Sequence, residues 1–90
     1  MERGVITVLG NDKVGIIASI CTYLAEANIN ILDISQTILQ GFFSMMMVVD
    51  VSKRNRSFDD LVSELNALGE KIGLQIKIQH EEIFNSMHRI

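Results

Sequence analysis

Proline and tryptophan are absent from this 90-residue chain, and cysteine occurs only once, at Cys21. A single cysteine can form neither an internal disulfide nor, by itself, a thiolate metal site, so we expect a reducing, cytoplasmic compartment. Hydrophobic residues make up 48% of the chain and charged residues 21%, which is typical of a folded rather than a disordered protein. At this length we expect one domain, residues 1–90, with a thin core.

An excess of basic residues is also missing. Eight Lys and Arg stand against eleven Asp and Glu, a net charge of −3, so no positive surplus exists to neutralise a phosphate backbone, and we expect no nucleic-acid partner. The one basic run, Lys53, Arg54 and Arg56, is interpreted as a solvated loop. No stretch of eighteen apolar residues and no signal-peptide h-region occurs. We therefore expect that the chain neither spans a membrane nor is exported.

Apolar patterns predict four strands, at 5–9, 30–39, 42–51 and 74–79. The second strand is half polar, with Ile31 and Asp33 on one face and Ile34 and Gln36 on the other, and suits a sheet edge. The third is apolar on both faces and suits the middle of a sheet. Residues 40–41, Gln-Gly, supply a hairpin turn between the two.

Helical spacing predicts two helices between these strands and a third after them. Asp12 is expected to be the N-cap of the first, whose apolar positions are Val14, Ile17, Cys21, Leu24 and Ala27. The second begins after Ser57 and stops at Gly73, with an apolar stripe of Phe58, Leu61, Val62, Leu65, Leu68 and Ile72. The C-terminal extension, 80–90, carries Ile83, Phe84, Met87 and Ile90 at helical spacing and is too short to be stable undocked.

This order predicts the α+β class, a ferredoxin-like βαββαβ two-layer sandwich with a four-stranded antiparallel sheet and a short C-terminal helix. Both helices between the strands would cover one side of the sheet only. The other side would expose large apolar residues of the third strand, which monomers rarely leave bare. We therefore expect a homodimer or higher homo-oligomer, or a lid formed by the C-terminal helix, packed on its own sheet or exchanged between subunits.

Four segments at successive positions resemble the ACT domain family. They are Asn11-Asp12-Lys13-Val14-Gly15-Ile16, Asn28-Ile29-Asn30-Ile31, Ile34-Ser35-Gln36 and the strand from Phe43 to Val51. The resemblance covers about residues 3–79, and the C-terminal run is similar to that of small stand-alone ACT-domain proteins of bacteria and archaea.

The resemblance implies a non-enzymatic regulatory module that binds a small ligand, usually an amino acid, between two ACT domains, without a cofactor. In the family's pattern the turn after the first strand offers backbone groups to the ligand, and the second strand adds an asparagine and a glutamine. These ligand-binding positions correspond here to Asn11, Asp12, Gly15, Ile16, Asn30 and Gln36. Val14 departs from the pattern, because many members have proline there, so this turn is expected to be less rigid.

Physical chemistry supports the same turn independently. The N–H groups at the start of a helix are unpaired and favour an anion, Gly15 would allow close approach, and Asn30 offers both a donor and an acceptor. The alternative is that Asp12 caps the helix itself, that Gly15 serves packing, and that Asn30 and Gln36 are ordinary polar residues of an edge strand.

Other classes with this topology lack their defining residues here. An RNA-binding domain would need an aromatic residue at Ser44, an acylphosphatase an arginine in the turn after the first strand, and a copper chaperone two cysteines there. His80 and His88 would lie about 12 Å apart on one helix, too far to share a metal, and are interpreted as solvated. One alternative stays open, a module that contacts a regulated protein through the Met-rich third strand and the tail, without any small ligand.

Overall fold

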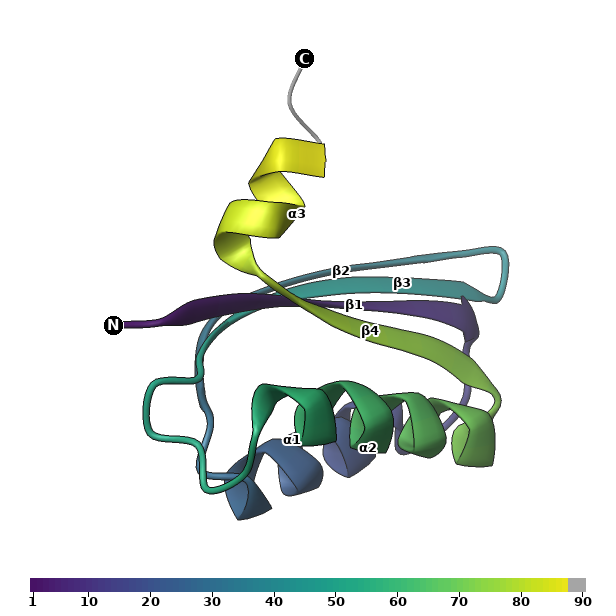
Figure 1. The fold of residues 1–90 in the computed structure, drawn as a ribbon. Helices are drawn as coiled ribbons and strands as arrows, with labels where there is room; N and C mark the ends of the chain where they lie inside the picture. The colour runs from purple at the N-terminus through teal and green to yellow at the C-terminus, as the bar shows by residue number, and fades with distance from the viewer. Residues whose placement is uncertain (88–90) are drawn as a thin grey trace.

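The computed structural model describes residues 1–87 (Figure 1). Along the chain the elements are β1 (Arg3–Asn11), α1 (Ile16–Glu26), β2 (Asn30–Leu39), β3 (Phe42–Asp50), α2 (Phe58–Ile72), β4 (Leu74–His80) and α3 (Glu81–Met87). The predicted βαββαβ order and the short C-terminal helix are confirmed. Within the described residues, none of the helices is both long and apolar enough to cross a membrane.

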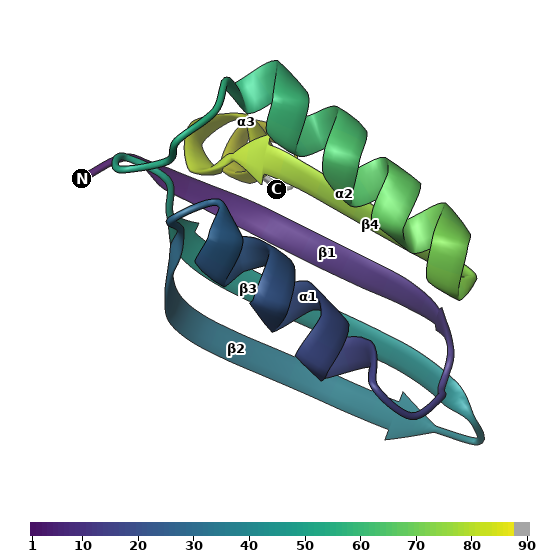
Figure 2. The ribbon, with the colours of Figure 1, turned by 90° about the horizontal axis from the view of Figure 1, so that it is seen from below.

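The sheet is antiparallel throughout, with strand order β2-β3-β1-β4, so β1 and β3 are central as predicted. Figure 2 shows both long helices on one side, α1 beside β2 and β3 and α2 along β4. We call this side the helix face, and the opposite side the outer face.

The core lies between the helix face and the two long helices. Alternate residues of the strands point into it because side chains alternate across a sheet. The largest fully buried side chains are Phe43, Ile6, Ile20, Leu24, Met47, Leu61, Leu65, Val8, Val49 and Val51. The α+β two-layer sandwich therefore has one core, between the sheet and the two long helices, and the outer face of the sheet is not part of that core.

The first helix starts later than predicted. Asp12 does not cap it; its own N–H donates to the Gly41 carbonyl at 2.7 Å, which ties residues 12–15 to the β2–β3 hairpin as a turn. Gly15, with φ +89°, then opens the helix. The buried positions are consequently Ile16, Ile20 and Leu24, whereas Val14, predicted to be apolar core, is fully exposed. Of the predicted stripe, only Leu24 and Ala27 are buried; Ile17 is 39% exposed and Cys21 is half-buried.

The second helix has the predicted ends. The Ser57 hydroxyl accepts a hydrogen bond from the Asp60 N–H at 3.0 Å, and Gly73 ends the helix with φ +75°. Leu61 and Leu65 are buried as expected, but Val62 is exposed, since it lies one position to the side of the stripe.

A bulge in β2 changes the predicted faces of that strand. Ile31 pairs with Val49, but the next paired residue is Asp33, opposite Val48. The register shift at position 32 places Ile31 on the helix face and Asp33 on the outer face, although the alternation had grouped the two together. From Ile34 onward the prediction holds. The hairpin turn at 40–41 is confirmed by positive φ angles at both of its residues.

Two side chains interpreted as solvated are held by the fold instead. Arg54 donates to the Glu2 carboxylate at 2.9 Å and to the Val51 carbonyl at 3.0 Å. His80 stacks on the Phe58 ring, with centroids 3.9 Å apart, and its Nδ1 lies 3.5 Å from Glu2. The N-terminus, the loop after β3 and the end of β4 are thereby joined.

The last helix, α3, follows β4 directly and stands on the outer face (Figure 1). It contacts β1 and β4 and covers Val5, which is only 4% exposed, and the Gln79 amide donates to the Met87 sulfur at 3.3 Å. Its predicted extension to Ile90, and His88, lie outside the described residues. Among residues 1–87, no group of three or more His, Cys, Asp or Glu could hold a metal ion.

One helical glycine is set by packing. A Cβ at Gly69 in α2 would stand 2.6 Å from the Leu74 carbonyl oxygen and 3.2 Å from an Ile76 side-chain atom. On an exposed helix surface, Gly→Ala stabilises by about 1 kcal/mol. Here the clash with backbone should reverse the sign, and we expect Gly69→Ala to lower the free energy of unfolding by about 1–3 kcal/mol.

Urea unfolding followed by circular dichroism measures this effect. The exposed Ser63 of the same helix gives the matched control, because Ser63→Ala should raise stability by a few tenths of a kcal/mol, about what helix propensity supplies. A Gly69→Ala variant more stable than the parent chain would contradict the close packing of α2 on β4.

Candidate functional site

The turn between β1 and α1 leaves backbone donors uncovered. The N–H groups of Ile16, Ile17 and Ala18 precede the first hydrogen bond of α1, which Ser19 donates to the Gly15 carbonyl at 2.9 Å. No side chain among residues 1–87 caps this helix start. Such groups, with the helix dipole behind them, favour an anion.

A hollow of about 270 Å³ lies beside this turn, between the start of α1 and the free edge of β2, and we call it the turn groove. It is lined by Asp12, Lys13, Gly15, Ile16, Ile17, Ala18, Gln36, Ile38 and Phe43. Four of the six predicted ligand positions thus lie together, three from the turn and Gln36 from the helix face of β2.

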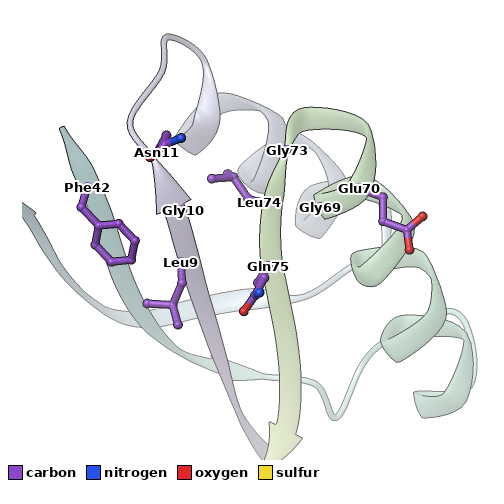
Figure 3. Close-up of a pocket in the computed structure, with 9 residues that line it drawn as sticks. All are labelled: Leu9, Gly10, Asn11, Phe42, Gly69, Glu70, Gly73, Leu74 and Gln75. Atoms are coloured by element: carbon purple, nitrogen blue, oxygen red, sulfur yellow. The ribbon is translucent and has the colours of Figure 1, made fainter.

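Asn11 lies on the other side of the sheet. It ends β1 opposite Phe42 and lines a second hollow, of about 420 Å³, at the edge of the outer face. Figure 3 shows Asn11 there above Gly10, with Phe42 and Leu9 nearby. Side chains alternate along β1, so the chain places Asn11 next to the turn groove in sequence but not inside it.

Asn30 lies at the far end of β2. It pairs with Asp50 and lines a separate hollow of about 250 Å³ with Asn28 and Lys53. Six residues of extended strand, about 20 Å, separate Asn30 from Gln36. Within one chain the structure therefore does not bring Asn30 to the turn groove, contrary to what a single shared site would require.

Two lysines flank the start of α1, and the sequence patterns assigned no role to either. Lys13 and Lys71 line a hollow of about 260 Å³ together with Gly15, Ile16 and Ser19. The Lys13 ammonium lies over Gly73, 2.9 Å from where a Cβ would stand. Lys71 reaches this place because α2 ends beside the start of α1, a tertiary neighbourhood that spacing along the chain does not reveal.

Comparison with known proteins agrees with this architecture. Residues 2–79 match the family model described as ACT domain. The chain belongs to the ACT domain family. A UPF0237 protein of Bifidobacterium longum is 53% identical over 90 residues, which is 100% of both chains.

Solved structures extend the comparison. An ACT domain protein from Streptococcus pneumoniae is 42% identical, with a TM-score of 0.80 over 92% of this chain and 93% of that one. The regulatory subunit of aspartate kinase from Thermus thermophilus has a TM-score of 0.67 over 87% of this chain and 50% of that one; at 21% identity the likeness is one of fold. The family predicted from the four segments is confirmed.

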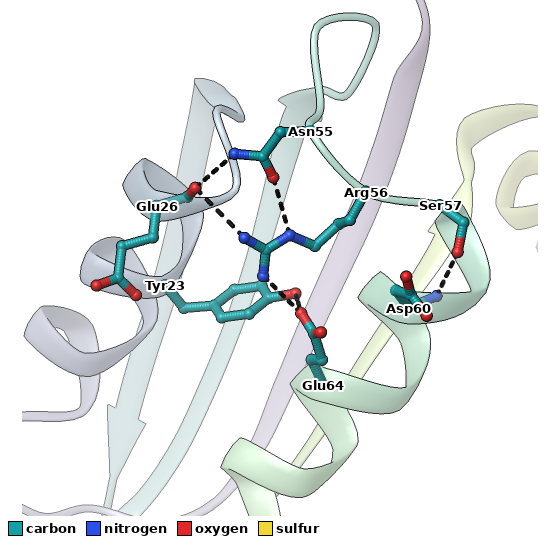
Figure 4. A network of polar contacts seen from close by, with 7 residues as sticks. All are labelled: Tyr23, Glu26, Asn55, Arg56, Ser57, Asp60 and Glu64. Atoms are coloured by element: carbon teal, nitrogen blue, oxygen red, sulfur yellow. Dashed lines mark hydrogen bonds and ion pairs between the residues drawn. The ribbon is translucent and has the colours of Figure 1, made fainter.

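This ACT domain also contains a polar cluster that sequence reasoning missed (Figure 4). The Tyr23 hydroxyl of α1 donates to the Glu64 carboxylate of α2 at 2.6 Å, and Arg56 donates to the same oxygen at 2.7 Å. The guanidinium lies 5.5 Å from the centre of the Tyr23 ring. Arg56 belonged to the run interpreted as a solvated loop, and its partners stand 33 residues before it and 8 after it, so no local pattern links them.

The same cluster fastens the end of α1. Asn55 and Arg56 both donate to the carbonyl of Glu26, at 2.8 and 3.4 Å, where the helix leaves acceptors unpaired. Burial and the hydrogen bond to Glu64 raise the pKa of Tyr23 to about 12. Hydrogen bonds from Tyr23 and Arg56 lower the pKa of Glu64. The cluster clamps α1, α2 and the loop together at the end of the domain opposite the turn groove.

The clamp makes a spectroscopic prediction. Tyr23 is the only tyrosine and tryptophan is absent, so ultraviolet absorbance reports its ionisation alone. We expect a midpoint of about 12 in the folded protein. Glu64→Gln should lower the midpoint while leaving it above about 10, because burial is the largest cause of the shift.

The matched control is Glu70→Gln, an exposed carboxylate on the same helix, which should leave the midpoint unchanged. The folded pKa of Tyr23 exceeds its unfolded value, so the stability it contributes is complete below about pH 10 and is lost as the pH rises through the folded pKa. A folded-state midpoint near 10 would contradict the clamp.

Proposed function

We propose that this ACT domain is a non-enzymatic regulatory module that binds a small ligand, an amino acid, in the turn groove, at an interface between two copies of the chain. The observation that carries the proposal is the turn groove itself. It joins the uncapped N–H groups of α1 with the side chains of Asp12 and Gln36. Those are complementary groups for a zwitterion.

The groove suits an amino acid in charge. A ligand carboxylate would accept from the first-turn N–H groups of α1. Because Asp12 does not cap the helix, its carboxylate is available to an ammonium group. Gln36 can both donate and accept.

The groove also suits an amino acid in size. Its volume, about 270 Å³, lies just below the range of about 300–1,000 Å³ typical of drug-sized ligands. Ile16 and Phe43 add an apolar lining for a side chain. Binding without reaction is the simplest use of such a lining, because it consists of backbone, amide, charged and apolar groups that position a ligand.

A second copy would complete the site. The groove opens at the edge of β2, whose residues are exposed from Leu32 to Leu39, and an exposed strand edge is a surface on which another chain can pair. Ile17 and Ile38, 39% and 52% exposed, add apolar surface beside it. Asn30 lies about 20 Å from Gln36 in its own chain, so it would contribute to the same ligand only from the second copy.

Membership of the ACT domain family supports the regulatory role. The fold is shared with the regulatory subunit of an aspartate kinase, which supports a regulatory use here. An amino-acid sensor acts by passing its signal on, so a regulated protein is the expected partner.

A second candidate is a protein-interaction module without a small ligand. The exposed apolar residues of the outer face, among them Phe42 and Met46, favour it. Ligand binding separates the two candidates.

A thermal-shift screen of the common amino acids, followed by calorimetry of the best ligand, tests the proposal. A ligand selective for the native state raises the melting temperature. Gln36→Ala should then weaken binding about five- to tenfold, since one net hydrogen bond is worth about 1 kcal/mol. Asn30→Ala should weaken it similarly if the second copy contributes.

Thr37→Ala is the matched control. Thr37 is the next residue of β2, also exposed but on the outer face, so its loss should leave the dissociation constant unchanged. A melting temperature unmoved by any amino acid, nucleotide or organic acid would overturn the proposal and leave the interaction module.

A further inference from the structure

The outer face is stepped. At one end α3 stands on it and covers Val5. At the other end, next to the β2–β3 hairpin, no helix stands above the sheet (Figure 1), and apolar side chains are exposed. We call this region the bare end; it consists of Leu9, Leu39, Phe42 and Met46, which are 40%, 69%, 50% and 42% exposed.

The raised part of the step is also apolar. Ile83 and Met87 of α3 are 51% and 66% exposed, although α3 contacts its own sheet. A seven-residue helix is too short to be stable without tertiary contacts. The contacts that α3 makes with its own sheet leave Ile83 and Met87 exposed, so a contact with another chain would stabilise the helix further.

The chain cannot cover its bare end with its own α3. The helix begins directly after His80, which pairs with Gly4, whereas the bare end lies level with Leu9 to Asn11. Five to seven residues of strand, about 17–23 Å, separate the two places, but α3 is only about 10 Å long. A lid formed by Ile83 and Met87 within one chain is therefore too short.

We propose that two copies of the chain pack outer face to outer face about a twofold axis, so that each α3 covers the bare end of the other. A stepped surface fits an inverted copy of itself, because the raised part of one meets the low part of its partner, as an isologous contact requires. The length of α3, about 10 Å, equals the usual distance between two packed layers of secondary structure.

The distribution of charge fits this contact. Outward side chains of the two central strands are uncharged from Val5 to Asn11 and from Phe42 to Val48. Charged residues of the outer face stand around this centre: Asp33 on β2 and Lys77 on β4 at its sides, and Arg3 and Asp50 at the end beside α3. An apolar centre with a charged rim is the anatomy of a protein–protein interface.

The area is sufficient for a small stable dimer. Four strands about 4.8 Å apart and about 30 Å long present roughly 550 Å² in projection, and the accessible area of uneven side chains exceeds the projection. The exposed sides of α3 add to it. The total approaches the roughly 800 Å² per partner of a standard interface.

This contact goes beyond the proposed function. The turn groove opens on the helix face at the edge of β2, so an outer-face contact leaves it open. Loss of the outer-face contact and loss of ligand binding can therefore be told apart, each by its own variants.

Cross-linking tests the arrangement. In a Cys21→Ala background, Phe42→Cys and Met87→Cys are combined in one chain and treated with a short bis-maleimide at micromolar protein. We expect a covalent two-chain species as the main product. The control pairs Met87→Cys with Val62→Cys, an exposed apolar position on α2 at the opposite side of the domain, and this variant should stay a single chain. An internal link between positions 42 and 87 would overturn the proposal in favour of a lid within one chain, and so would equal products from both pairs.

Sedimentation equilibrium gives the second measurement. Phe42→Lys should reduce the assembly mass to half that of the parent chain and weaken the contact at least tenfold, because it buries an unpaired charge. Val62→Lys should leave the mass unchanged. Should Phe42→Lys fail to fold, Met87→Lys on α3 makes the same test. A monomeric parent chain, or equal masses for all variants, would overturn the proposal, whatever the outcome of the ligand screen.

Discussion

The rest of the structure depends on one constraint: two helices cover only one face of a four-stranded sheet. Residues 1–87 contain no third long helix with which to build a second full layer. The core is accordingly confined to the helix face, where Ile6, Met47 and Leu65 are fully buried. Apolar residues on the outer face can therefore be covered only by α3 or by another chain. The proposed self-association follows from this imbalance, and the turn groove lies at the unprotected edge of the covered face.

Sequence reasoning succeeded where a local pattern has one structural meaning. Ser57 marks the start of α2 because its hydroxyl caps the helix, and Gly73 marks the end because glycine readily adopts a positive φ. Residues 40–41 form the predicted two-residue hairpin turn. It failed where a tertiary contact decided. Asp12 has the sequence pattern of an N-cap, but its N–H donates to the carbonyl of Gly41, 29 residues along the chain. The helix α1 consequently begins only at Ile16, and a different set of its residues is buried. The bulge at position 32 of β2 likewise has no signature in the alternation of residues.

The candidate site divides in the same way. Asp12, Gly15 and Ile16 are neighbours in sequence, so their grouping could be predicted, and Gln36 joins them because β2 runs antiparallel beside the turn. Asn30 belongs to the same strand but to its opposite end, and a motif read along the chain carries no information about which copy would supply it. Lys71 and the clamp of Tyr23, Arg56 and Glu64 were invisible for a related reason, since their partners come from different elements.

The hairpin between β2 and β3 gives the two proposed surfaces a physical connection. The turn that lines the turn groove is bonded to the hairpin through the Asp12 N–H and the Gly41 carbonyl, and Phe42 of the bare end is the next residue. A ligand that orders the turn would therefore also restrain the hairpin against which the partner's α3 packs. Linkage requires the reverse as well, so that outer-face association would favour the ligand by the same factor. A small sensor of this kind would need no moving domain, because one backbone hydrogen bond already joins its binding groove to its surface of association.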